Sequence, residues 1–358
     1  MALHFHQLTI KNIKRETQDC VSISFNIPTE LKSEFLFTQG QSLTLRKILD
    51  GEEIRRSYSI CSSPFDNELR VAVKQVLGGL FSTFANTKLK AGDIIDVMPP
   101  SGNFYTELNS LNKKNYLAFA AGSGITPIIS LIKTTLITEP QSTFTLVFGN
   151  RNTSSIIFKE ELEALKDKHI QRLRLYHILS RERMDTEINY GRINAGKCLQ
   201  LTKLIDINAA DEIFICGPEE MIFSVRDYFL EKRIDKLKIH FELFTTPLRK
   251  AASYKPQAAK ETNQETSKIT VTLDGKSFDF NLDYNSNNIL DAALAQGADL
   301  PFACKGGVCT TCRAKLIEGK IEMEVNYGLE PDEVEAGFIL TCQSHPRTEK
   351  VVVDFDVK

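Results

Sequence analysis

Four cysteines in the last sixty residues have a spacing that suits iron–sulfur chemistry. Cys304, Cys309 and Cys312 form a C-x4-C-x2-C segment, and Cys342 follows after 29 further residues. This is the spacing of cysteines that hold a [2Fe–2S] cluster, in which four thiolates bind two irons. The segment therefore predicts a one-electron carrier in this part of the chain.

The residues between these cysteines support a cluster over a zinc site. Gly306 and Gly307 permit the backbone angles that wrapping a cluster requires, and small residues let N–H groups turn toward the sulfurs. The alternative is structural zinc, which is usually held by paired C-x2-C elements. Only one such pair is present, so we favour the cluster. The other cysteines at 20, 61 and 198 are expected to be buried without a special role.

A second group of residues, which could bind a cofactor, lies in the first third of the chain. In an extended segment Arg56 and Tyr58 point to one side, and Ser57 and Ser59 point to the other. Arginine suits a phosphate, and a tyrosine ring can lie against a planar cofactor. Further on, Gly78-Gly79-Leu80-Phe81-Ser82 offers unhindered N–H groups and a serine at a predicted helix start, which is a phosphate cradle.

A third group follows an apolar strand. Tyr116–Ala121 leads into Gly122-Ser123-Gly124-Ile125-Thr126-Pro127 and then into an apolar helix. A glycine turn between strand and helix lets a phosphate approach the helix N-terminus. Pro127 is tolerated in the first helical turn because its missing N–H has no partner there. The context predicts a dinucleotide site.

The elements that must position these residues change character along the chain. Residues 1–108 show short alternating runs such as 21–25 and 69–73, with turn signals such as Asp50-Gly51, which predict a β-barrel. Residues 109–245 alternate apolar strands with helical patterns, which predicts an α/β domain with a parallel sheet. Residues 246–267 have few large apolar side chains and are interpreted as a linker. Residues 268–358 contain short elements of mixed type, with one helix predicted near 289–296.

Composition excludes several classes of function. The 358 residues carry a net charge of −2, so nothing indicates nucleic-acid binding. The charge is uneven, because residues 268–358 hold 15 acidic and 9 basic residues, a net of −6. No apolar run reaches the ~18 residues of a membrane span. The N-terminus lacks a secretory pattern and the cysteines cluster, so we expect a cytoplasmic protein without membrane or nucleic-acid partners.

These motifs carry two family resemblances. Residues 268–358 resemble plant-type ferredoxins, which implies a β-grasp fold of the α+β class with one [2Fe–2S] cluster. The segments Arg56-Ser57-Tyr58-Ser59, Gly122–Pro127 and Cys216-Gly217-Pro218-Glu219-Glu220-Met221 resemble the ferredoxin–NADP reductase superfamily. The whole chain, apart from the linker, resembles oxygenase reductases that carry flavin, nicotinamide and ferredoxin domains. Within this class it is most similar to the reductase subunits of phenylacetyl-CoA epoxidases.

The resemblance implies roles for the residues around a flavin. Arg56 would hold a flavin phosphate, and Tyr58 would lie on the isoalloxazine beside Ser57. Ser59 would hydrogen-bond near the flavin N5, where hydride arrives. The cradle residues Gly79, Leu80 and Ser82 would hold the pyrophosphate. FAD is the family's common choice, and FMN is the alternative.

The resemblance also implies how a nicotinamide nucleotide is held. Gly122, Gly124, Thr126 and Pro127 would bind its pyrophosphate, with Cys216 and Gly217 beside the nicotinamide. In NADPH-dependent relatives, residues placed like Arg151, Ser180, Arg181 and Arg192 contact the 2′-phosphate, so NADPH is favoured over NADH. Glu242 and Phe244 close the last predicted strand and could approach the nicotinamide side of the flavin. We favour the alternative, in which they are a strand residue and a core aromatic.

The function implied is electron transfer from NADPH through FAD and the cluster to an oxygenase. The epoxidase of phenylacetate catabolism is the favoured acceptor. The alternatives are the reductase of another oxygenase, hydroxylase or desaturase, and a free-standing diaphorase without a dedicated partner. The acceptor lies outside this chain, so its identity rests on the resemblance alone.

Overall fold

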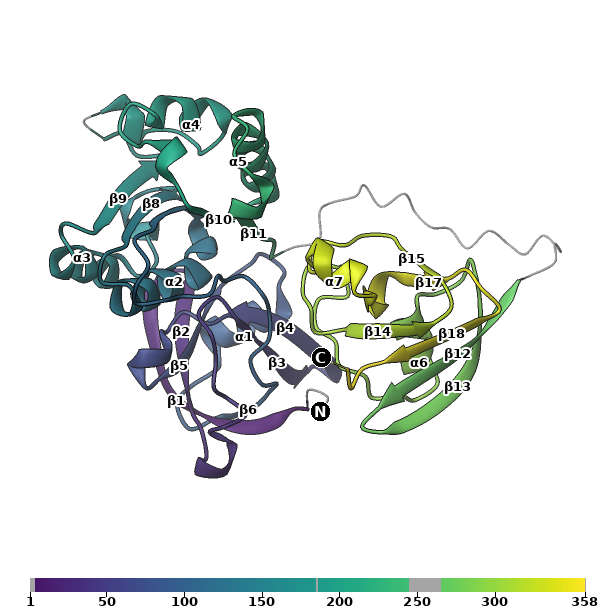
Figure 1. Cartoon of the computed structure of the whole chain (residues 1–358). Helices are drawn as coiled ribbons and strands as arrows, with labels where there is room; N and C mark the ends of the chain where they lie inside the picture. Colours follow the sequence, from purple (N-terminus) through teal and green to yellow (C-terminus); the bar gives the residue numbers. More distant parts are fainter. Residues whose placement is uncertain (1–3, 185, 245–264, 358) are drawn as a thin grey trace. The chain divides into compact units, whose positions relative to one another are not determined.

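The computed structural model describes residues 4–184, 186–244 and 265–357 (Figure 1). The chain divides into two compact units, His6–Phe244 and a second that contains the described residues from Glu265 onward. The first unit holds the predicted flavin and nucleotide domains. The second holds the predicted ferredoxin domain.

The flavin domain is an antiparallel sheet that closes on itself. Its strands are β1 (His6–Thr17), β2 (Cys20–Asn26), β3 (Ser42–Leu49), β4 (Glu52–Ser59), β5 (Leu69–Lys74) and β6 (Ile94–Val97), in the order β4-β3-β6-β1-β2-β5. The two edges meet where Ile60, just beyond β4, bridges Val71 of β5. Helix α1 (Leu80–Thr87) follows β5. The predicted barrel is confirmed.

The hairpin between β3 and β4 forms at the expected turn. Asp50 and Gly51 both have positive φ, 52° and 85°. Two such residues between paired strands match the twist of a hairpin, and Asp-Gly is a preferred pair for it. The register that follows sets Leu43 opposite Tyr58 and Ser42 opposite Ser59. The turn therefore fixes which face of β4 each functional side chain occupies.

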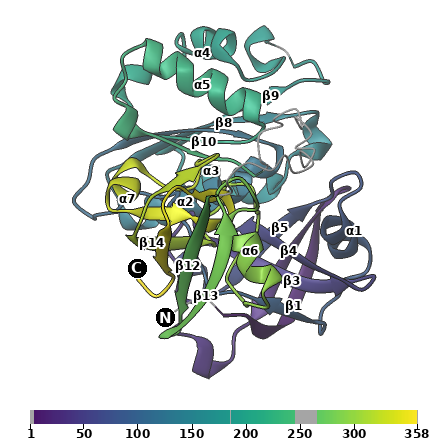
Figure 2. The ribbon, with the colours of Figure 1, turned by 90° about the vertical axis from the view of Figure 1, so that its right-hand side faces the viewer.

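The nucleotide domain is a five-stranded parallel sheet. Its strands β7 (Asn115–Ala121), β8 (Thr143–Asn150), β9 (Leu173–Leu179), β10 (Glu212–Cys216) and β11 (Ile239–Glu242) lie in the order β11-β10-β7-β8-β9. Figure 2 shows α4 (Ala195–Leu201) and α5 (Glu219–Glu231) on one face, and α2 (Ile125–Thr138) and α3 (Lys159–Lys168) on the other. Parallel strands covered on both faces are apolar throughout, which is why they could be predicted.

A buried carboxylate fastens the end of α2. Glu139 is fully buried and accepts hydrogen bonds from Tyr116 (3.0 Å), Ser142 (2.7 Å), the Asn109 N–H (3.0 Å) and Asn112 (2.7 Å). Burial raises the pKa of Glu139, but these four donors outweigh burial and hold the pKa below its ordinary value.

We expect Glu139→Gln to lower the free energy of unfolding by about 3 kcal/mol at pH 7, because four donors then face an amide. The folded pKa lies below the unfolded one, so this contribution is present above the unfolded value of 4.5 and is lost as pH falls below it. Urea unfolding at pH 7 and pH 4 checks this, with exposed Glu160→Gln as control. An equal difference at both pH values would contradict it.

The second unit is a mixed sheet with a helix packed on it. Strands β12 (Thr266–Leu273), β13 (Lys276–Asp283), β14 (Arg313–Glu318), β16 (Phe338–Leu340) and β18 (Lys350–Asp354) lie in the order β13-β12-β18-β14-β16, with β12 and β18 parallel. Helix α6 (Ile289–Ala295) packs into their core, and β15 (Ile321–Met323), β17 (Ser344–Pro346) and α7 (Pro331–Glu335) complete the unit. The predicted α+β fold and its helix are confirmed.

The predicted linker ends two residues too late. Strand β12 begins at Thr266, so Thr266 and Ser267 belong to the sheet, where Ser267 is fully buried. The polar composition of residues 260–267 hid the start of a strand that alternates buried and exposed positions. Residues 246–264 of the predicted linker lie outside the described residues.

Candidate functional site

Strand β4 presents the predicted flavin residues with the expected alternation. Ser57 faces Thr44 across the pair, with hydroxyls 3.3 Å apart, while Arg56 lies opposite Leu45. Arg56 is exposed, donates to the carbonyl of Arg55 at 2.7 Å, and has no ion pair with any described residue. An exposed guanidinium without a carboxylate partner fits the predicted phosphate role.

Tyr58 and the glycine loop come together through an aromatic pair. The Tyr58 ring lies 5.5 Å from that of Phe81, in the first turn of α1. Burial raises the pKa of Tyr58, so its phenol stays protonated. The start of α1 offers backbone N–H groups that have no partner inside a helix. The structure thus places the predicted cradle beside the predicted ring-packing residue.

Ser82 shapes this loop from within. Its hydroxyl accepts from the Val76 N–H at 3.1 Å and donates to the Gly79 carbonyl at 3.3 Å. A Cβ at position 79 would lie 2.5 Å from the Ser82 oxygen, so any larger residue there would displace the Ser82 hydroxyl. Leu80 is exposed beside them, while Ser82 is buried. The local bonds indicate that Ser82 supports the cradle, and its direct contact with pyrophosphate stays a prediction.

The nucleotide turn lies where two neighbouring strands end. Gly122 has φ +54° and begins a short 3-10 turn that leads into α2. A Cβ on Gly124 would lie 2.0 Å from the Cys216 carbonyl oxygen, and one on Gly217 would lie 2.7 Å from Met221. Glycine at both positions therefore lets the ends of β7 and β10 touch. The predicted residues of these two motifs form one site.

Thr126 and Pro127 serve the start of α2. The Thr126 hydroxyl donates to the Ser123 carbonyl at 3.0 Å, and both helix residues are buried. Pro127 is the third residue of the helix, still in the turn whose N–H groups need no helical partner. They stabilise the turn, and their contact with a nucleotide stays a prediction.

A serine of the barrel meets a carboxylate of the sheet. Ser59 donates to Glu242 at 2.9 Å, and Glu242 lies opposite Cys216 in the β10–β11 pair. Burial raises the pKa of Glu242 to about 7, although the Ser59 hydrogen bond lowers it. Burial, and then the charge of Glu242, raise the pKa of Cys216. Ser59 and Cys216, the two residues predicted to be catalytic, are thus both neighbours of Glu242, whose carboxyl group has a pKa near neutrality.

Glu242 is a candidate site residue that the sequence did not reveal. Its pattern indicates an ordinary strand residue, and its partner Ser59 lies 183 positions away in sequence. Its position in the sequence could have identified Glu242 as a site residue. A residue at the carboxyl end of a parallel strand lies at the edge of the sheet where ligands bind. Phe244, by contrast, is 40% exposed and shows no contact with the group.

The predicted 2′-phosphate residues gather at the carboxyl edge of β8 and β9. The Arg181 N–H donates to the Arg151 carbonyl at 2.8 Å, and the Ser180 N–H donates to that of Asn150 at 2.9 Å. The loop carrying Arg192 returns to this edge, because Ile193 contacts Gly149. All three arginines are exposed and form no ion pair within the described ranges. The edge therefore has uncompensated positive charge.

A neighbouring carboxylate, Glu182, forms no ion pair with Arg151, Arg181 or Arg192. Glu182 accepts from the Thr153 N–H at 2.8 Å and from its hydroxyl at 2.7 Å, and these bonds lower the pKa of Glu182. The bonds tie the turn after β9 to the turn after β8. Glu182 therefore joins the two turns that carry Arg151 and Arg181.

We expect Arg181→Glu to reduce the preference for NADPH over NADH. The loss is roughly tenfold to hundredfold, because a hydrogen bond to a charged group contributes about 1.5–3 kcal/mol. The matched control is Arg174→Glu, at the opposite end of the same strand. The ratio of kcat/KM for the two nucleotides measures the effect. An unchanged ratio would refute the assignment of the 2′-phosphate residues.

The four cysteines of the second unit lie close together. The Cys309 thiol donates to the Cys304 sulfur at 3.1 Å, and the Cys342 thiol interacts with both Cys304 and Cys312. The contact with Cys309 lowers the pKa of Cys304 to about 2, whereas contacts with Cys304 raise the pKa of Cys309 and of Cys342. No three His, Cys, Asp or Glu residues among those described surround a single ion position. Four thiols brought together from a C-x4-C-x2-C segment and a distant cysteine match the ligand set of a [2Fe–2S] cluster.

The backbone of the cysteine loop fits a cluster as predicted, with one correction. The Gly306 N–H points at the Cys304 sulfur, 3.3 Å away. Gly307 has φ +72°, and a Cβ there would lie 2.8 Å from the Val325 carbonyl oxygen. The other residue with positive φ is Lys305, at 50°, and not Gly306. Lys305 is held by an ion pair with Asp291 at 2.7 Å, which ties this residue to α6.

Comparison with known proteins agrees with this geometry. Three family models match: an oxidoreductase FAD-binding domain at residues 7–105, an oxidoreductase NAD-binding domain at 119–227, and a 2Fe-2S iron-sulfur cluster binding domain at 271–347. The chain is 45% identical to one of the subunits of the 1,2-phenylacetyl-CoA epoxidase of Escherichia coli (strain K12), over 99% of this chain and 98% of that one. It is 34% identical to the 3-ketosteroid-9-alpha-monooxygenase, ferredoxin reductase component, of Rhodococcus rhodochrous, over 97% and 96%.

The chain belongs to the flavin- and iron–sulfur-dependent reductases of oxygenases. The reductase has the fold of phthalate dioxygenase reductase, with a TM-score of 0.59 at 22% identity over 98% of each chain. The predictions of an oxidoreductase with FAD, a [2Fe–2S] cluster and NAD(P)H are confirmed. None of its described helices is long and apolar enough to cross a membrane.

Proposed function

We propose that this reductase supplies electrons from NADPH to the oxygenase subunits of a phenylacetyl-CoA epoxidase. The observation that carries the proposal is the 45% identity to the Escherichia coli epoxidase chain, which extends over all three domains. The identity falls to 34% with the 3-ketosteroid monooxygenase component and to 29% with the glycine betaine monooxygenase reductase subunit of Pseudomonas aeruginosa (strain UCBPP-PA14).

The residues of the barrel bind and orient FAD in this proposal. Arg56 pairs with a phosphate, Tyr58 lies along the ring, and the start of α1 after Gly79 receives the pyrophosphate. When bound, FAD and the cluster together convert a two-electron hydride donor into a source of single electrons. The chain's part is to bind them, exclude water and hold them in place.

The residues at the carboxyl edge of the sheet bind the nicotinamide nucleotide. The turn from Gly122 to Thr126 receives its pyrophosphate, and Arg151, Arg181 and Arg192 with Ser180 hold the 2′-phosphate of NADPH. Cys216 and Gly217 line the nicotinamide side. Ser59 hydrogen-bonds at the reacting edge, and Glu242 orients the Ser59 hydroxyl through their 2.9 Å hydrogen bond.

The four thiolates of Cys304, Cys309, Cys312 and Cys342 hold the cluster from which the oxygenase takes electrons. Thiolates and a [2Fe–2S] cluster are best preserved in a reducing compartment. All eight cysteines are free in this structure, which supports a place in the cytoplasm.

Reconstitution tests the proposed partner. The purified reductase is mixed with the oxygenase subunits of a phenylacetyl-CoA epoxidase, and NADPH-dependent epoxide formation from phenylacetyl-CoA is measured. Parallel reactions contain the 3-ketosteroid monooxygenase oxygenase, or ferricyanide as an artificial acceptor. Tightly coupled epoxide formation supports the proposal. Coupling to the steroid enzyme alone indicates another oxygenase, and ferricyanide reduction without any coupled product indicates a diaphorase.

A further inference from the structure

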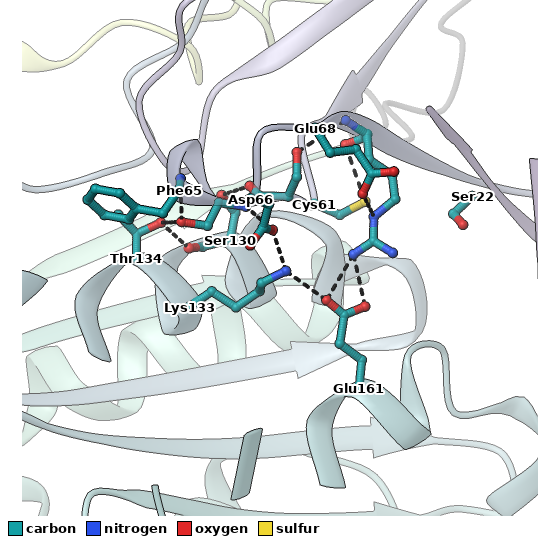
Figure 3. A network of polar contacts seen from close by, with 12 residues as sticks. Ser22, Cys61, Phe65, Asp66, Glu68, Ser130, Lys133, Thr134 and Glu161 are labelled. Atoms are coloured by element: carbon teal, nitrogen blue, oxygen red, sulfur yellow. Dashed lines mark hydrogen bonds and ion pairs between the residues drawn. The ribbon is translucent and has the colours of Figure 1, made fainter. Parts of the chain in front are cut away.

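A charged network joins the flavin barrel to the nucleotide sheet (Figure 3). Both oxygens of Glu161, on α3, accept from Arg70 of β5 at 2.9 Å, and one of them accepts from Lys133 of α2 at 2.8 Å. Lys133 also forms an ion pair with Asp66, which ends the 3-10 turn Pro64–Asp66 before β5. We call Asp66, Arg70, Lys133 and Glu161 the interdomain clamp. Two of its members belong to the barrel and two to the nucleotide domain.

A neutral layer beside the clamp ties α2 to the same barrel segment. The Ser130 hydroxyl donates to the Ser62 carbonyl at 2.6 Å, and the Thr134 hydroxyl lies 3.0 Å from that of Ser63. Ser62, Ser63 and Ser130 are fully buried. Positions 130, 133 and 134 share one helix face. That face of α2 is therefore fastened along more than one turn to residues 62–66.

The clamp charges are largely withdrawn from water and depend on one another. The side chains of Arg70 and Lys133 are 13% and 12% exposed, and that of Glu161 is 23% exposed. Burial lowers the pKa of Lys133, but Glu161 and Asp66 outweigh burial and hold the pKa above its ordinary value. Removing Glu161 would leave each base with a single carboxylate, since Lys133 would keep Asp66 and Arg70 would keep Glu68 at 3.5 Å. The contact between the two domains would then be weaker and the partly buried charges less well compensated. Such networks select one arrangement of the groups they join.

The clamp sits between the two sites without belonging to either. Strand β4 ends at Ser59, three residues before Ser62. Helix α2 begins at Ile125, five residues before Ser130, or about 7.5 Å along the helix axis. The neutral layer is thus close in sequence to the reacting serine and to the nucleotide turn, and the clamp residues Asp66 and Lys133 follow it by four and three residues. The clamp residues have no hydrogen bond with Ser59, Cys216 or Glu242 in the part of the chain that is described.

We propose that the interdomain clamp positions the nicotinamide-binding turn against the flavin-binding strand, and so sets the geometry for hydride transfer. This inference rests on the proposed binding of both cofactors to the first unit. The four residues are positioning residues and touch neither cofactor. A small misplacement of reacting groups is costly, since about 1 Å can lower a rate by roughly a hundredfold. Weakening the clamp therefore lowers the rate of hydride transfer more than it lowers the affinity for the nucleotide.

The test compares Glu161→Gln with Glu163→Gln in the full chain loaded with FAD and cluster. Glu163 lies on the same helix and forms an exposed ion pair with Lys159 at 3.6 Å, so it is a matched control. Anaerobic stopped-flow mixing with NADPH gives the limiting rate of flavin reduction and the nucleotide Kd. We expect the limiting rate of Glu161→Gln to fall about tenfold, with Kd changed less than about threefold. The control should match the unmodified reductase.

A second readout does not depend on activity. Hydrogen–deuterium exchange, measured without nucleotide, should become faster in Glu161→Gln at residues 60–68 and in the first half of α2, and should be unchanged in the control. Asp66→Asn, which removes a single arm of the clamp, should show the same changes to a smaller extent. It serves as the test if Glu161→Gln does not fold.

The outcomes separate this inference from the proposed function. If the unmodified reductase is not reduced by NADPH or NADH, the proposed function is wrong. If it is reduced and the clamp variants keep its limiting rate, the clamp has no positioning role. A raised Kd with an unchanged limiting rate, or unchanged exchange at residues 60–68, would also overturn the inference.

Discussion

Replacing Cys304 with serine is expected to stop electron delivery to one-electron protein acceptors while the flavin is still reduced by NADPH. Cys304 accepts a hydrogen bond from Cys309 and interacts with Cys342. Serine oxygen is a poor substitute for a thiolate at iron. Since loss of even an outer partner lowers metal affinity about 10- to 100-fold, we expect a loss of more than ~100-fold in acceptor reduction.

The measurement pairs iron and sulfide analysis with two assays, reduction of an oxygenase or cytochrome and stopped-flow reduction of the flavin. The control is Cys198→Ser, at a buried thiol of α4 whose pKa burial raises to about 12. This thiol is inert and lies outside the second unit, so the control should keep both activities. A Cys304→Ser variant with full cluster content and full acceptor reduction would contradict the assignment of the cysteines.

Removing the Ser59 hydroxyl is the second change with a large expected effect. Ser59 is the barrel residue that meets the carboxyl edge of the sheet, where it donates to Glu242. Loss of one preorganised hydrogen-bonding group at a reacting centre typically costs about 10²- to 10³-fold in rate. We expect Ser59→Ala to lower the limiting rate of flavin reduction by about 100-fold, with normal FAD content. Ser42→Ala, opposite Ser59 in the β3–β4 pair, is the control, because its hydroxyl donates to the Ser101 carbonyl.

The carboxyl group beside Ser59 adds a pH dependence. Burial raises the pKa of Glu242 to about 7, so its ionisation changes the charge next to Ser59 near neutral pH. The folded pKa lies above the unfolded value of 4.5, so the fold is favoured below that value and loses this contribution as pH rises through about 7. Over this pH range the free energy of unfolding changes by up to about 3 kcal/mol.

Glu242→Gln should remove this dependence. The melting temperature of the unmodified reductase should fall relative to that of the variant between pH 5 and pH 8. The pH profile of flavin reduction should flatten in the variant. A difference in melting temperature that is constant across this range would show that Glu242 does not titrate there.

Much of this site could be predicted because its residues are close in sequence. The cysteine loop carries three of the four predicted ligands in nine residues, and its spacing alone indicates the cluster. The Asp50-Gly51 turn fixes the register of β4, and the glycine turn after β7 fixes the start of α2. In each case local backbone requirements determine the structure, and these requirements are visible in residue types.

Other features depend on contacts between distant residues. Glu242 becomes significant only because the fold brings Ser59 to it, and Arg70 pairs with Glu161 across 91 positions. Helix α4 is also absent from the predicted elements, because it has only seven residues and contains Gly196, which weakens a helical pattern. The positive φ of Lys305 could not be predicted from residue type, since lysine rarely adopts it.

The central claim is that this chain carries electrons internally from NADPH through FAD to its cluster. An anaerobic absorbance titration of the purified reductase, with NADPH and separately with NADH, tests it most directly. We predict that flavin and iron–sulfur bands both bleach at low concentrations of NADPH and that NADH is less effective. Bleaching of the flavin while the cluster bands of a fully loaded protein stay unchanged would contradict the claim.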